Sequence, residues 1–139
     1  MKIAKFLVLA ASISLGSNVL AQALSPVYGI EFREQLGLAL TQITVWQASQ
    51  LNEQDLTGLN QDVRKFDKLA ARDAHVERVE QEGAIVYRLT LSQVTTFDCK
   101  MMRAAVEHDE MAKSIEIVSS AGVRETSCGD DDTVTLTVR

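Results

Sequence analysis

Two cysteines, Cys99 and Cys128, and the segment that marks the chain for export constrain its fold more than any other feature. An even cysteine count in an exported chain is typical of a disulfide. The spacing of 29 positions does not fit a C-x-x-C redox motif, and two thiols with two distant histidines make a poor zinc site. We therefore predict a Cys99–Cys128 disulfide, whose loop of about 30 residues is worth roughly 3–4 kcal/mol on the chain-entropy model.

The export prediction rests on the first 23 residues, which have the three parts of a secretory signal peptide. Two lysines lie in the first five residues, "FLVLAASISLG" (Phe6 to Gly16) is apolar, and Ala21-Gln22-Ala23 supplies the small residues that signal peptidase recognises. Spanning a bilayer takes about 20 apolar residues, so this run is too short for an anchor. We expect cleavage after Ala23, with Ala21 as the alternative, and a periplasmic or secreted protein without a membrane span.

The remaining chain, residues 24–139, has the length of one domain. The net charge of −5 falls to −7 when the two lysines of the signal peptide are removed. Binding to a nucleic-acid backbone needs clusters of basic residues, and binding to anionic lipid needs a basic amphipathic face. The sequence contains neither, so we expect no nucleic-acid partner and no lipid-binding surface.

The apolar pattern predicts a long helix from Ile30 to about Asn52. Leu38 and Val45 widen its apolar arc, so we expect the helix to lie against a sheet or a partner. A shorter helix is predicted from about Leu59 to Arg72. The residues that recur at helical spacing on the first helix are Phe32, Leu36, Leu40, Ile43 and Trp46.

The second half of the chain alternates apolar and polar residues in a way that is typical of strands. A further helix is predicted from Thr95, with Thr95 and Asp98 as a capping box. The expected fold class is α+β, with helices packed on a mostly antiparallel sheet of about four strands and the last helix tied by the disulfide. The predicted strands are "HVERVEQEG", "AIVYRLTLS", "KSIEIVSS" and "TVTLTVR".

Catalytic and metal-binding patterns are weak in this sequence. The only histidines, His75 and His108, lie 33 positions apart, and there is no G-x-S-x-G nucleophile motif. The acidic neighbours of His108 in "EHDE" point around a helix and do not converge. We therefore predict neither an enzyme nor a metal or cofactor site. Calcium binding by the carboxylates Asp130 to Asp132 stays open as an alternative to a plain acidic turn.

The layout of the C-terminal half resembles that of type IV pilins, especially the type IVb kind. It consists of the strand "AIVYRLTLSQV", the cysteine-bearing helix "TFDCKMMRAAV", the strand "SIEIVSS", the loop "ETSCGDDD" and the last strand "TVTLTVR". In these pilins a disulfide similarly joins a helix to the loop before the final strand, which corresponds to Cys99 and Cys128. The resemblance covers roughly Ile30 to Arg139 and implies a long helix packed on the sheet.

One departure from the pilin pattern bears on function. Pilins keep an apolar N-terminal half-helix with an early glutamate, whereas "YGIEF" is followed at once by Arg33, Glu34 and Gln35. The resemblance therefore implies a pilin-like accessory or secreted protein of a type IV pilus or related secretion system, acting by protein–protein contact.

The same helix supplies the candidate partner-binding residues. They are Phe32, Leu36, Leu40, Ile43 and Trp46, on the condition that the sheet leaves part of their arc uncovered. The alternative function is a periplasmic binding or sensor module for a small ligand, held in a pocket between sheet and helix. A small hydrolase is a more distant third possibility.

Overall fold

An antiparallel sheet with helices packed on one of its faces confirms the predicted α+β class. The computed structural model describes residues 26–50, 52–108 and 111–139, so the predicted signal peptide lies outside the described residues. Its helices are α2 (Pro26–Ser49), α3 (Thr57–Val63), α4 (Asp67–Ala70) and α5 (Thr96–His108). Its strands are β1 (His75–Gln81), β2 (Ala84–Val94), β3 (Ala112–Val118), β4 (Arg124–Glu125) and β5 (Asp132–Val138).

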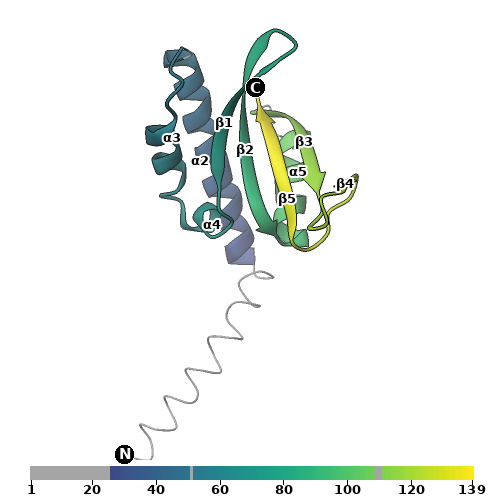
Figure 1. Ribbon diagram of the computed structural model, residues 1–139. Coiled ribbons are helices and arrows are strands. Elements are labelled where there is room, and N and C mark those ends of the chain that lie inside the picture. The colour runs from purple at the N-terminus through teal and green to yellow at the C-terminus, as the bar shows by residue number, and fades with distance from the viewer. Residues whose placement is uncertain (1–25, 51, 109–110) are drawn as a thin grey trace, which may run out of the picture.

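The strands follow the order β1-β2-β5-β3-β4, and every neighbouring pair is antiparallel. The long helices α2 and α5 lie behind the same face of this sheet, while α3 and α4 lie beside its β1 edge (Figure 1). The opposite face carries polar cross-strand neighbours, such as Thr90 and Thr135, whose hydroxyls are 2.9 Å apart. The sheet therefore has one face in the core and one face toward solvent.

The core lies between the helices and the sheet face that they cover. Alternate residues of each central strand point toward the helices, because successive strand side chains alternate between the two faces. On the helical side, residues three and four apart present one stripe to the sheet. The largest fully buried side chains are Tyr87, Leu89 and Leu91 of β2, Leu136 of β5, Phe32, Leu36, Leu40 and Ile43 of α2, Met102 of α5, and Leu59, Val63 and Leu69 near the β1 edge.

The shorter predicted helix is interrupted in the structure. Phe66 has an extended backbone (φ −80°, ψ 110°) between α3 and α4. The break is stabilised from α2, because the Lys68 amide donates to Gln35 Oε1 at 2.8 Å and Gln35 Nε2 donates to Asp67 Oδ1 at 2.7 Å. A side chain more than 30 positions away thus supplies the cap of α4, which local sequence patterns do not show.

The sheet also has a fifth strand that the sequence pattern did not predict. The two residues of β4 pair with Ile117 and Val118 at the end of β3, inside the segment expected to be a turn-rich loop. At the other edge, Asn60 of α3 covers part of β1. Its Nδ2 donates to the Val76 carbonyl at 3.2 Å, and the Val76 amide donates to its Oδ1 at 2.7 Å. Asn60 thus forms hydrogen bonds with the amide and the carbonyl of Val76, which an additional strand would otherwise use for pairing.

The predicted disulfide joins Cys99 and Cys128, with an S–S distance of 2.03 Å. The same loop also caps the start of α5, because Asp130 Oδ1 accepts hydrogen bonds from the amide and the hydroxyl of Thr96 at 3.0 and 2.9 Å. Within the predicted capping box, the Asp98 amide donates to Thr95 Oγ1 at 3.1 Å. In a capping box the Asp98 carboxylate would reach back to the Thr95 amide. In the structure this carboxylate instead points into the interior.

Asp98 is fully buried and joins α5 to the start of α2. Tyr28 Oη donates to its Oδ1 at 3.0 Å, and Arg72 Nε donates to its Oδ2 at 2.9 Å. Arg72 also donates through Nη1 to the Gln93 carbonyl at 3.0 Å. A buried carboxylate is stable only when it is paired and hydrogen-bonded, and both oxygens of Asp98 are. This cluster fixes the first turn of α2 against α5.

Removing the disulfide tests its contribution to stability. We expect the Cys99→Ala/Cys128→Ala variant to lose roughly 3–4 kcal/mol of unfolding free energy, because the unfolded chain is no longer restricted by the closed loop. Urea denaturation of the variant and of the wild type, with and without reductant, measures this loss. Reduced wild type should match the variant, and a loss below about 1 kcal/mol would contradict the expectation.

The Tyr28 phenol provides a pH test of the buried cluster. Burial raises the pKa of Tyr28 above its usual value of 10.0, the Asp98 carboxylate raises this pKa further, and Arg72 partly offsets both effects. Because the folded-state pKa is raised, the stabilisation from the protonated phenol is complete below pH 10 and is lost as the pH rises through the folded-state value. We expect the wild-type minus Tyr28→Phe ultraviolet titration to show a phenol that ionises above pH 10. Ionisation at or below that pH would argue against the buried contact with Asp98.

Candidate interaction surface

The predicted partner-binding residues lie on the sheet-facing side of α2. Phe32, Leu36, Leu40 and Ile43 are at most 1 % exposed, and Trp46 is partly buried against the same core. The condition for a docking surface, an arc left uncovered by the sheet, is therefore not met at these positions. The helical periodicity identified the stripe that the domain uses for its own core.

The opposite side of α2 carries a second apolar stripe. Ile30, Leu38 and Val45 are 64, 48 and 60 % exposed, respectively. With a rotation of about 100° per residue, these positions lie on one side of the helix, opposite the sheet. They are three of the four large hydrophobic residues exposed in the part of the chain that the structure describes, the fourth being Val123. We call the stripe of Ile30, Glu34, Gly37, Leu38, Thr41 and Val45 the outer face of α2.

Most of the outer face carries no charge. No Asp, Glu, Lys or Arg occurs between Glu34 and Glu53. The neighbouring helix α5 differs, since its exposed positions include Lys100 and Glu107. A helix with apolar residues on opposite sides is normally buried on both of those sides. The cores of protein interfaces are depleted of charged residues. The outer face of α2 has the composition of such an interface.

The hydroxyl groups on the exposed side of α2 are bonded within the helix. Thr41 Oγ1 donates to the Gly37 carbonyl at 2.9 Å, Thr44 Oγ1 to the Leu40 carbonyl at 2.9 Å, and Ser49 Oγ to the Val45 carbonyl at 2.8 Å. Covering a hydroxyl that already has a partner avoids the cost of leaving it unpaired. These polar groups therefore add little to the cost of excluding water from this side of the helix.

The outer face also contains a shallow depression of about 510 Å³. A Cβ atom placed on Gly37 would have no atom within 4 Å, so the backbone of α2 is open to close approach here. The residues around the depression are Ile30, Arg33, Glu34, Gly37, Leu38, Thr41 and Met111.

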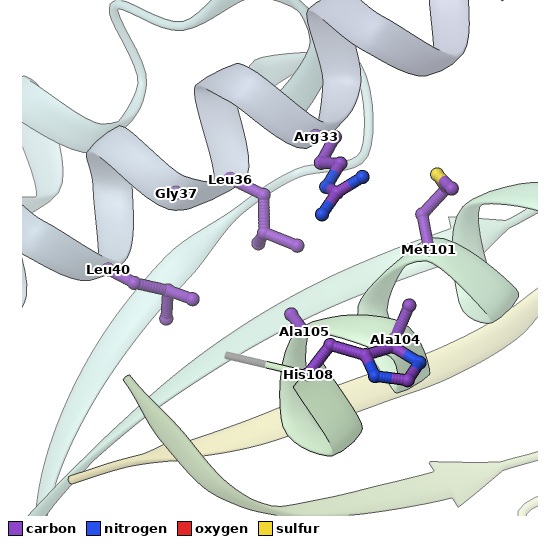
Figure 2. Close-up of a pocket in the computed structure, with 8 residues that line it drawn as sticks. All are labelled: Arg33, Leu36, Gly37, Leu40, Met101, Ala104, Ala105 and His108. Atoms are coloured by element: carbon purple, nitrogen blue, oxygen red, sulfur yellow. The ribbon is translucent and has the colours of Figure 1, made fainter. Parts of the chain in front are cut away.

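The groove between α2 and α5 is much smaller. Its cavity is about 30 Å³, close to the volume of one water molecule. Figure 2 shows its lining, which is Arg33, Leu36, Gly37 and Leu40 from α2 and Met101, Ala104, Ala105 and His108 from α5. Pockets for small organic ligands are typically about 300–1,000 Å³, so this groove is too small for one.

A second depression, of about 200 Å³, lies on the open face of the sheet. Polar side chains dominate it, including Arg88 of β2, Ser114 of β3 and Thr137 of β5. It is smaller than typical ligand pockets and lacks their apolar lining. Neither depression matches the predicted pocket between sheet and helix.

The carboxylates considered for calcium have separate structural roles. Asp130 caps α5 at Thr96, and Asp132 Oδ2 accepts a hydrogen bond from the Gly129 amide at 2.7 Å. Within residues 26–50, 52–108 and 111–139, no three His, Cys, Asp or Glu side chains are grouped so that they could hold a metal ion. The "EHDE" segment lies partly outside the described residues.

Comparison with known proteins identifies no relative of this chain. It matches none of the protein-family models, curated proteins or solved structures with which it was compared. Within the described residues, no helix has both the length and the apolar character needed to cross a membrane.

Alanine substitutions on the two sides of α2 test this assignment. We expect Leu40→Ala to lower the free energy of unfolding by about 2–5 kcal/mol, because it leaves a cavity in the core. Leu38→Ala should change it by less than about 0.5 kcal/mol, because the side chain is half exposed. Urea denaturation of both variants measures the difference. Equal losses would show that Leu38 also contributes to the domain's own core.

Proposed function

We propose that this chain is an exported, non-enzymatic protein that acts through protein–protein contact, with the outer face of α2 as its docking surface. The observation that carries the proposal is a solvent-facing helix side that is apolar, uncharged beyond Glu34, and internally hydrogen-bonded at its hydroxyl groups. Covering this face with another apolar surface would remove Ile30, Leu38 and Val45 from water. Glu34 is the one charged residue of the face and has to keep its contact with water in such a complex.

The shape and charge of the outer face favour, as its partner, a helix with a largely uncharged apolar side. Ile30 and Val45 are 15 residues apart, so the stripe runs about 22 Å along the helix axis. It is a narrow ridge beside a shallow depression, and helices pack by placing such ridges into grooves. The absence of charge beyond Glu34 leaves nothing to pair with a charged partner segment.

The pilin-like part of the proposal rests on the layout of the elements. Two features support it: a long helix on an antiparallel sheet, and a helix tied by Cys99–Cys128 to the loop before the final strand. An intact disulfide is compatible with a location outside the cytoplasm. An accessory role in a type IV pilus or related secretion system follows from this resemblance. The small-ligand alternative expects a pocket between sheet and helix, and the groove between α2 and α5, of about 30 Å³, is too small for a typical ligand.

Site-specific photo-cross-linking in the native cell envelope tests the docking surface. A benzophenone amino acid replaces Leu38, Val45 or, as a control on the outer side of α5, Glu107. We expect positions 38 and 45 to cross-link to the same helical segment of a protein partner, identified by mass spectrometry. Position 107 should give no such product. Cross-links from position 107 alone, or none from positions 38 and 45, would contradict the proposal.

A further inference from the structure

We propose that the helix covering the outer face of α2 is α2 of a second copy of this chain, packed antiparallel about a two-fold axis near Gly37 and Leu38. This inference rests on the proposed function and adds the identity and register of the partner. It follows from the spacing of the outer-face residues, from the depression beside Gly37, and from the position of the charges.

The outer face is complementary to itself when one copy is reversed. Ile30 lies eight residues before Leu38, and Val45 lies seven residues after it. An antiparallel pair centred between Gly37 and Leu38 therefore places Ile30 of each copy opposite Val45 of the other. The same register places Glu34 opposite Thr41. A two-fold interface requires one patch to match its own reversed copy, and the outer face of α2 meets this requirement.

The centre of the pair combines a projecting side chain with a vacant position. Leu38 is half exposed on one copy, and Gly37 on the facing copy offers open space where a side chain would stand. The surface of the depression beside Gly37 is mainly apolar, although the charged residues Arg33 and Glu34 also line it, together with Ile30, Leu38, Thr41 and Met111. Each copy supplies one Leu38 and one depression, so the central contact occurs twice.

The charges of the outer face favour the antiparallel arrangement over the parallel one. Glu34 lies toward the N-terminal end of the stripe, and the antiparallel register places it opposite the uncharged residue Thr41. A parallel pair in register would bring the two Glu34 carboxylates together, which is destabilising. Antiparallel helices also place their opposite dipole ends side by side.

The predicted dimer is weak because one helix of each copy forms most of the interface. Standard stable interfaces bury about 1,600 Å² in total, and two helices in contact along about 22 Å bury less than that. We therefore expect a reversible dimer whose population depends on protein concentration.

Sedimentation equilibrium of the processed protein over a concentration series tests for this dimer. We expect reversible dimerisation in the wild type and at least a tenfold weaker association in Leu38→Glu and Gly37→Leu. Gly37→Leu fills the depression, and it exchanges a glycine for a stronger helix former, so the monomer should remain folded. The matched control is Val123→Glu, which adds the same charge at an exposed apolar residue away from α2 and should dimerise like the wild type.

Cross-linking with a short bis-maleimide tests the register. Ile30→Cys mixed with Val45→Cys should form a cross-linked pair, while each variant alone should form little. The native cysteines do not react because both are in the disulfide. A parallel dimer would give the reverse pattern and would overturn the antiparallel register.

The two sets of experiments separate this inference from the proposed function. A wild type that stays monomeric at every concentration, while positions 38 and 45 still cross-link to a different protein in the envelope, overturns the second-copy inference alone. A concentration-dependent dimer that Leu38→Glu and Gly37→Leu leave unchanged also overturns it, because the dimer would then use another surface. Absence of any contact at positions 38 and 45 overturns both.

Discussion

The packing of one stripe of α2 against the sheet is the contact on which the rest of the structure depends. Phe32, Leu36, Leu40 and Ile43 fill the space above β2 and β5, and their burial determines which side of the helix faces solvent. Ile30, Leu38 and Val45 are exposed because they lie opposite this stripe on the same helix. The candidate interaction surface is therefore a geometric consequence of the core.

The first turn of α5 holds this arrangement together through three consecutive residues. Phe97 packs over Gly29, where a Cβ atom would lie only 2.8 Å from its ring. Asp98 binds Tyr28 and Arg72, and Cys99 is bonded to Cys128. These contacts join α5 to the start of α2, to the segment before β1, and to the loop before β5. A short stretch of sequence thus connects parts of the chain that are far apart.

The fold class, the disulfide and most of the elements could be predicted because they depend on local periodicity and on a pair of cysteines. The break at Phe66 and the strand β4 could not, since they depend on Gln35 and on the end of β3, which are distant in sequence. The predicted partner-binding residues Phe32, Leu36, Leu40 and Ile43 are buried in the core, because helical periodicity identifies an apolar stripe without showing what covers it. The absence of charge between Glu34 and Glu53 was the available sign that the solvent-facing side of α2 is also uncharged.

Cysteine accessibility in intact cells tests most directly whether the outer face of α2 is covered by a partner, as we propose. A Leu38→Cys variant and a Val123→Cys variant are each treated with a membrane-permeant maleimide, once as purified dilute protein and once in intact cells. Coverage by a partner predicts that position 38 is labelled in the purified protein and shielded in intact cells, while position 123 is labelled in both. Equal labelling of position 38 in both settings would show that the outer face is exposed in the cell and would contradict its role as an interface.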